Sequence, residues 1–269
     1  MIVLFSLAKL VLHLLTAHGY GYFRDELYYL ACTEHLAAGY VDHPALSIVV
    51  LWLVRHTLGT SLLALRLVPT LAGAATVALV GAMARQMGGG RLAQALAMTG
   101  ALVAGSFLSL DFFYSMNALD LLLWAWAAYL IVRLCETGGE GARLWLLLGL
   151  ALGLGLANKI SVLWLGAGLA TGLVVLPERR WLKTLGPWLA STLALLGGLP
   201  YLLWNAANGW PTREFIHNAT TQKMVAVSFV AFVRGQIESM NPFTLPLWLA
   251  GLAFLFFQPL GKRFRLLGV

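Results

Sequence analysis

The chain has 269 residues, of which 60% are hydrophobic and 11% charged, and its mean hydropathy is +0.81. A water-soluble domain of this length cannot cover so many apolar side chains, so the composition excludes that class and predicts an all-α polytopic membrane protein. The formal net charge of +7 is spread through short segments and not gathered in one basic block, which argues against nucleic acid as a partner.

Eight apolar stretches are long enough to predict membrane spans. They cover residues 2–19, 61–84, 92–110, 117–134, 144–158, 161–177, 184–204 and 243–258. Lys9 interrupts the first stretch, so either its side chain snorkels to the membrane surface or the span is slightly shifted. No cleavage pattern of small residues follows this stretch, and we expect it to remain as a membrane anchor.

The connections between these stretches differ in charge, and the difference predicts an orientation. Alternate connections and the C-terminal end together hold ten cations against three acids, which the positive-inside rule places in the cytoplasm with the N-terminus. The loops at 20–60 and 205–242 are then extracytoplasmic. Cys32 and Cys135 fall on opposite sides of the membrane, so we expect no disulfide.

The first outer loop carries a concentration of polar residues that is unusual in such an apolar chain. Its segments 25–38 and 44–58 have the pattern of amphipathic helices lying in the outer interface, with Gly39 and Pro44 at the turn between them. A single acid at a helix start is explained by capping. Capping does not explain a group of four ionisable residues in one loop, which predicts a wet functional pocket: Asp25, Glu26, Asp42 and His43.

Six short motifs follow one another along nearly the whole chain. They are YFRDELYY (22–29), GYVDHP (39–44), LRLVP (65–69), YSMN (114–117), GLGLANK (153–159), and WN (204–205) with NGWP (208–211). With these motifs the sequence resembles glycosyltransferase family 39, the bacterial relatives of protein O-mannosyltransferases and of lipid A aminoarabinose transferases. The first loop is the most specific part of this resemblance.

The resemblance implies a GT-C type helix bundle in the bacterial inner membrane, with about eight transmembrane helices and two interfacial helices. Its donor would be a sugar on polyprenyl phosphate, which agrees with the absence of a glycine-rich phosphate loop. We expect residues 1–269 to form a single transmembrane domain. Family members usually continue into further spans and often a soluble domain, so this domain would be either a short form or a fragment.

The same resemblance assigns Asp25, in the Asp25–Glu26 pair, as the catalytic base. A carboxylate that removes the proton of a hydroxyl acceptor contributes a factor of roughly 10² to 10⁴ in rate. A second catalytic group is expected at either Asn117 or Asp120, and the sequence does not separate the two. The acceptor would be a hydroxyl of a lipid, a glycan or a protein.

A lipid phosphate leaving group calls for cations to hold it and not for a strong general acid. The available cations are Arg66, Lys159, Arg213 and Arg234, of which Arg66 and Lys159 could instead snorkel to the interface. In the aminoarabinose branch a lysine stands at the position of His43, beside an acid matched by Asp42. Tyr29 is a candidate to stack on the sugar, although loop aromatics also form interfacial belts.

Two alternatives from other classes remain open at the level of sequence. A transporter or flippase would move a polyprenyl-linked substrate without chemistry, but such proteins favour paired repeats, and the two halves of this chain show none. A catalytically silent relative would serve as a membrane scaffold. No cofactor is expected with certainty, and Asp42 with His43 lacks the further ligands of a metal site.

Overall fold

The computed structural model describes all 269 residues, and its regular secondary structure is helical apart from an isolated bridge between Gly39 and Pro44. The α-helices are α1 (Ile2–Thr16), α2 (Arg24–Cys32), α3 (Leu46–Leu58), α4 (Leu62–Gln86), α5 (Arg91–Val103), α6 (Gly105–Leu110), α7 (Met116–Glu136), α8 (Ala142–Asn158), α9 (Val162–Val175), α10 (Gly186–Ala207), α11 (Pro211–Asn218), α12 (Phe229–Ser239) and α13 (Leu245–Phe257). Short 3₁₀ or π turns complete the chain: η1 (Pro177–Lys183), η2 (Ala219–Lys223), η3 (Pro242–Thr244) and η4 (Gly261–Leu267).

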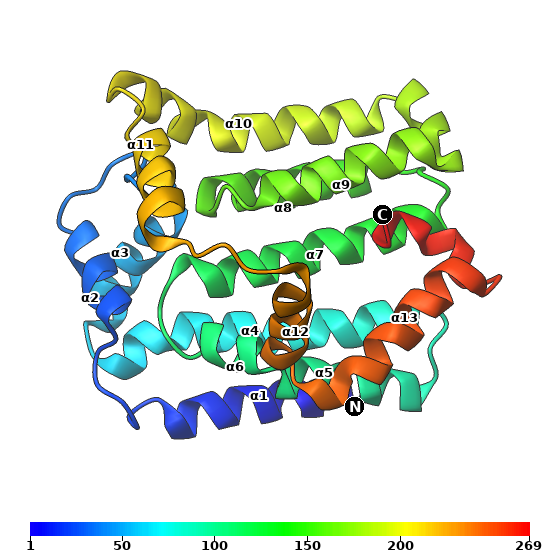
Figure 1. Cartoon of the computed structure of the whole chain (residues 1–269), viewed down its shortest axis with the longest axis horizontal. Helices are drawn as coiled ribbons and strands as arrows, with labels where there is room; N and C mark the ends of the chain where they lie inside the picture. The colour runs from blue at the N-terminus through cyan, green and yellow to red at the C-terminus, as the bar shows by residue number, and fades with distance from the viewer.

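The long helices lie side by side as a stack (Figure 1). α1, α4, α7, α8 and α10 follow one another across the stack, and α9 lies beside α8. The first-loop helices α2 and α3 and the later α11 gather at one end, which we call the site end. The connections at 87–90 and 137–141 and η1 lie at the other end.

Three helices, α4, α7 and α10, are long and apolar enough to cross a membrane. Two bent pairs could each add one span: α9 with η1, bent by 102°, and α12 with Pro242–Phe257, bent by 90°. The prediction of a helical membrane protein is thereby confirmed. Each of the eight apolar stretches contains a helix, but α1, α5 and α8 are shorter than 18 residues, so the count of eight spans stays a prediction.

The two helices predicted in the first outer loop are present as α2 and α3, with the turn at Gly39 and Pro44 between them. α2 ends at Cys32, sooner than the predicted segment 25–38, and a turn continues from Thr33 to His35. Cys32 and Cys135 are both free and buried, one in α2 and the other near the end of α7.

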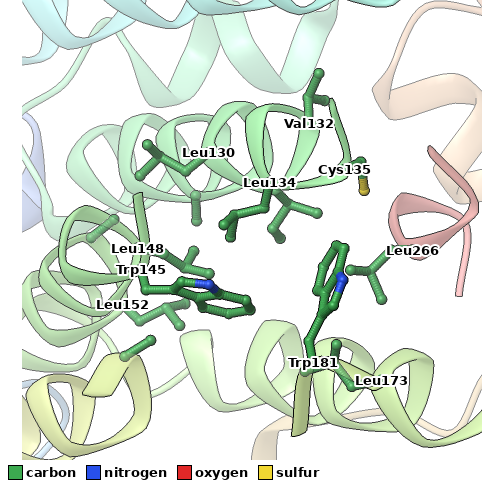
Figure 2. Packing of buried hydrophobic residues seen from close by; sticks show 14 of the residues in the cluster. Leu130, Val132, Leu134, Cys135, Trp145, Leu148, Leu152, Leu173, Trp181 and Leu266 are labelled. Carbon is green, nitrogen blue, oxygen red and sulfur yellow. The ribbon is translucent and has the colours of Figure 1, made fainter. Parts of the chain in front are cut away.

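The main hydrophobic core lies away from the site end, among α7, α8, α10, η1 and the C-terminal turn (Figure 2). The rings of Trp145 and Trp181 meet edge to face at 5.8 Å between centroids. Along α8 and α10 the backbones approach closely, because a Cβ at Gly153 would lie 2.8 Å from the carbonyl oxygen of Leu193. Small residues at this contact hold the two helices together without large side chains between them.

The segments rich in cations share the end opposite to the site. They include the α4–α5 connection, the α7–α8 connection and η1, and η4 joins them because Arg263 Nε donates a hydrogen bond to the Cys135 carbonyl oxygen at 3.1 Å. The cation-rich connections predicted to share one side therefore lie at one end of the fold. Which end faces the cytoplasm stays a prediction.

Candidate active site

The site end brings together four parts of the chain that are distant in sequence. These parts are the loop at 17–61 with α2 and α3, the start of α7, the linker between α8 and α9, and the end of α10 with α11. A small hydrophobic cluster supports them from beneath: Tyr29, Cys32, Ile48, Leu51, Leu65 and Tyr114. The polar side chains above this cluster form the candidate site.

Glu26 and Arg66 form a closed, buried pair. Arg66 uses all five of its N–H groups, two on the Glu26 carboxylate and three on the backbone carbonyl oxygens of Ala17, Tyr20 and Gly21. Glu26 also accepts the backbone N–H groups of Phe23 and Tyr114, at 2.9 and 3.1 Å. With side chains 0% and 1% exposed, neither residue has a hydrogen-bonding position left for a substrate.

Asp25, the neighbour of Glu26 in the first turn of α2, is in the opposite situation. Its side chain is 41% exposed, and its only ion-pair partner is Arg24 at 3.0 Å, whose side chain is 86% exposed. It stands one turn before Tyr29 on the same face of α2. The carboxylate of Asp25 is thus the open member of the pair.

Asp42 and His43 lie against the tyrosines of α2. Tyr28 donates its hydroxyl hydrogen to Asp42 Oδ1 at 2.6 Å, and burial together with this bond raises the pKa of the Tyr28 phenol. His43 is fully buried, stacks on Tyr29 with 4.8 Å between ring centroids, and shares a hydrogen bond between Nδ1 and the Pro44 carbonyl oxygen. Its Nε2 lies 3.8 Å from Asp42 Oδ1.

A second polar group surrounds Lys159 in the linker between α8 and α9. Lys159 Nζ donates to Asn117 Oδ1 at 2.7 Å and lies 3.5 Å from Asp120 Oδ2. Ser161 donates its hydroxyl hydrogen to the Asp120 carboxylate at 2.9 Å. The Lys159 side chain remains 29% exposed, so the ammonium is oriented by two residues of α7 while it still faces outward.

Tyr29 connects the two groups. The backbone N–H of Met116, at the start of α7, donates to the Tyr29 hydroxyl oxygen at 3.2 Å. Burial raises the pKa of this tyrosine, and the negative charges of Asp42 and Asp25 add to the effect. Tyr29 is almost fully buried and joins α2 to the start of α7.

An open apolar groove leads to this end of the molecule between α9 and α10. It has a volume of about 410 Å³, and its lining includes Ile160, Leu199, Tyr201 and the exposed Arg213 of α11. Tyr201 and Thr212 fix α11 to α10 through a hydrogen bond of 2.6 Å between their hydroxyl groups. Toward the opposite end the groove continues into a second apolar pocket of about 340 Å³, which shares Leu156, Leu163 and Leu195 with the first.

The structure therefore gathers most of the predicted residues and separates one. Asp25, Tyr29, Asp42 and His43 lie in the first loop, with Asn117, Asp120 and Lys159 joined to them through Tyr29 and Met116. Arg234 lies on α12, which contacts α6 and η3, and it is engaged with Glu238 at 2.6 Å. Ser161 and the hydroxyl of Tyr28 are the polar partners that sequence reasoning missed. Ser161 lies outside the six motifs, and nothing local in YFRDELYY pairs Tyr28 with Asp42.

Comparison with known families identifies the class of this protein. Residues 42–204, well over half of the chain, match the family model described as dolichyl-phosphate-mannose-protein mannosyltransferase. The chain belongs to this family. As a member of the mannosyltransferase family it is a membrane glycosyltransferase of the GT-C superfamily. The family implies, in general terms, a polyprenyl-phosphate sugar as donor and an acceptor.

The matched range includes Asp42, His43, Asn117, Asp120 and Lys159, and it begins after Asp25 and Glu26. The mannosyltransferase family therefore supports the class of enzyme but not the assignment of the base. Neither a curated protein nor a solved structure matches the chain.

Proposed function

We propose that this protein is an inverting glycosyltransferase that moves a monosaccharide from a polyprenyl-phosphate donor to a hydroxyl acceptor, with Asp25 as general base. The reaction would take place at the extracytoplasmic face of a bacterial inner membrane, at the site end of the bundle. The single observation that carries the proposal is the contrast within one dipeptide: Glu26 is closed by four hydrogen bonds, whereas Asp25 is open.

The chemical step needs one base and one anion-binding group. Asp25 removes the acceptor's hydroxyl proton while the acceptor oxygen bonds to the anomeric carbon. The bond between this carbon and the phosphate oxygen breaks, and the lipid phosphate leaves with the electron pair. Because the leaving group is already an anion, a neighbouring cation stabilises it better than a proton donor does.

Lys159 supports the second requirement. Its ammonium is held by Asn117 and Asp120, remains partly exposed, and stands next to Ile160, which lines the apolar groove. In this proposal Asn117 and Asp120 share the task of orienting Lys159, and Ser161 fixes the Asp120 carboxylate. In this proposal Glu26 and Arg66 hold the elements of the site together and do not contact the substrate.

The groove between α9 and α10 supports a donor that is lipid-linked. Its apolar lining suits a polyprenyl chain, and Arg213 adds a cation where the groove reaches the site end. His43 is buried and cannot reach a phosphate without moving, so in this account it keeps Tyr29 and Asp42 in place.

The direct experiment uses membranes that contain the protein. They are incubated with radiolabelled polyprenyl-phosphate mannose and, in parallel, with other polyprenyl-phosphate sugars. Transfer is measured as the amount of lipid phosphate that is released. Transfer by the wild-type chain that is lost in Asp25→Asn supports the proposal. Transport of the intact lipid-linked sugar without release of its phosphate would instead support the flippase alternative.

A further inference from the structure

A second buried ion pair lies deeper in the bundle, beneath the candidate site. Lys9 Nζ, on α1, is 2.8 Å from Asp111 Oδ2, and the two side chains are 0% and 1% exposed. Lys9 Nζ also donates to the carbonyl oxygen of Phe107 at 3.3 Å. The side chain of Lys9 therefore points into the bundle and does not snorkel to a membrane surface, the first alternative that the sequence left open.

The surroundings are shaped to hold this pair. A Cβ at Gly73 of α4 would lie 2.5 Å from Asp111 Oδ2 and 2.9 Å from Lys9 Cε, so only glycine leaves room for both side chains. His13, one turn further along α1, is also buried, and its ring nitrogens have no hydrogen-bond partner within the protein. Charged groups are rare within membrane bundles, and those that persist usually serve a function.

Asp111 begins the linker 111–115, which joins α6 to α7. The other end of this linker is fixed by the Glu26–Arg66 pair, because Tyr114 donates its backbone N–H to Glu26 Oε1 at 3.1 Å. Between these two points the rings of Phe112 and Phe113 lie over the Arg66 guanidinium, at 4.8 and 5.2 Å from their centroids. The linker is thus anchored by a buried ion pair at each end.

The first turn of α7 follows directly from the linker and carries parts of the candidate site. Ser115 caps this helix by accepting the backbone N–H of Asn117 at 3.2 Å, and the side chain of Asn117 holds Lys159. Met116 contacts Tyr29 of α2 through its N–H and Asn158 of α8 through its carbonyl oxygen, at 3.2 and 2.8 Å. A displacement of the linker would therefore be felt by Lys159 and by the helix that carries Asp25.

We propose that Lys9 and Asp111 are positioning residues: their intramembrane ion pair fixes linker 111–115 and so sets Asn117 and Lys159 relative to Asp25. The inference rests on the proposed glycosyl transfer for its catalytic readout only. It goes beyond stability, because a pair that served the fold alone could be replaced by two apolar side chains without loss of function.

The test compares the wild type with the charge-free double variant Lys9→Met/Asp111→Leu and with the exchanged variant Lys9→Asp/Asp111→Lys. Single variants strand one buried charge and so disturb folding. The double variant should accumulate in the membrane at the wild-type level, with kcat lowered at least tenfold and the donor KM changed by less than threefold. The exchanged variant should recover part of kcat. Arg133→Gln, which breaks the Arg133–Glu136 pair near the opposite end, is the control and should keep the wild-type kcat.

A second readout does not depend on glycosyl transfer. Spin labels at Leu27→Cys on α2 and Leu163→Cys on α9, both exposed positions, report the distance across the site when Cys32 and Cys135 are replaced by alanine. The proposal expects this distance distribution to broaden in the charge-free variant and to narrow again in the exchanged variant. A charge-free variant with wild-type kcat and an unchanged distribution would overturn it, and so would one that fails to accumulate, because the pair would then serve folding. Absence of transfer by the wild type would count against the proposed function only, since the distances would still decide the role of the pair.

Discussion

Arg66 Nε and Nη2 donate to the two carboxylate oxygens of Glu26 at 3.0 and 2.9 Å, in a place where neither side chain is exposed. This pair joins α2 to α4 and, through Tyr114, to the linker before α7. The conspicuous acid pair of the first loop is thus divided between two tasks. One acid holds the site together, and the other is available for chemistry.

Removing one member of this pair should destabilise the protein more than it changes the reaction. Arg66→Met leaves a buried carboxylate without its counter-ion, and such losses cost about 3–5 kcal/mol. We expect a lower unfolding temperature in detergent and reduced accumulation in membranes. The exposed pair of Arg234 and Glu238 provides the control, because Arg234→Met should change the unfolding temperature little. Wild-type stability of Arg66→Met would contradict the closed geometry of the pair.

Lys159 should act on the donor. The variant Lys159→Met removes the ammonium that Asn117 holds at 2.7 Å, and hydrogen bonds to charged groups contribute about 1.5–3 kcal/mol. We expect the donor KM to rise at least tenfold, measured by initial rates at varied donor concentration. Lys159→Arg should retain part of the affinity. An unchanged KM in Lys159→Met would remove this residue from phosphate binding.

The hydrogen bond from Tyr28 to Asp42 gives a prediction for alkaline pH. Burial and this bond raise the pKa of the Tyr28 phenol in the folded protein above its unfolded value of 10.0. The resulting stabilisation is complete below that unfolded value and is lost as the pH rises toward the folded one. The unfolding temperature of the wild type should therefore fall more steeply above pH 10 than that of Tyr28→Phe, which lacks this titration. Equal slopes in thermal melts between pH 8 and pH 11 would contradict the assignment.

The contact between α8 and α10 predicts a strong difference between glycines. A Cβ at Gly197 would collide with the backbone of Gly153, whereas a Cβ at Gly166 of α9 meets nothing within 4 Å. Gly197→Ala should destabilise the protein by about 1–3 kcal/mol, as overpacking usually does. Gly166→Ala should be neutral or slightly stabilising, since alanine favours helix. Denaturant titrations of the two variants compare these effects directly.

The sequence predicts the helices well, because helices depend on local patterns, and a local pattern also marks the first loop as the candidate site. The apolar stretches predict helices, and the group of four ionisable residues distinguishes the first loop from the rest of an apolar chain. The pairings are not local. Glu26 meets Arg66, and Lys9 meets Asp111, only once α1, α4 and the linker before α7 are packed. Sequence reasoning placed Glu26 among the ionisable residues of a wet pocket and Arg66 among the cations for the lipid phosphate. The folded chain instead engages every polar position of both side chains.

The ion pair of Lys9 likewise could not be predicted from the sequence. A lysine in an apolar stretch commonly snorkels, and nothing near Lys9 in the sequence indicates a partner. Its partner Asp111 follows the break between α5 and α6 at Ala104, where the backbone becomes extended. The register of α1 against that break is a property of the packed bundle and cannot be derived from either segment alone.

The most direct test of the account is the rate of transfer by Asp25→Asn. The substitution keeps the shape of the side chain and removes the carboxylate that we propose as base, so kcat should fall by roughly 10² to 10⁴ while accumulation and unfolding temperature stay near those of the wild type. Glu34→Gln, an equivalent change at an exposed acid just beyond α2, serves as the control and should keep wild-type activity. If Asp25→Asn transfers sugar from polyprenyl phosphate as fast as the wild type, Asp25 is not the base and the central claim is wrong.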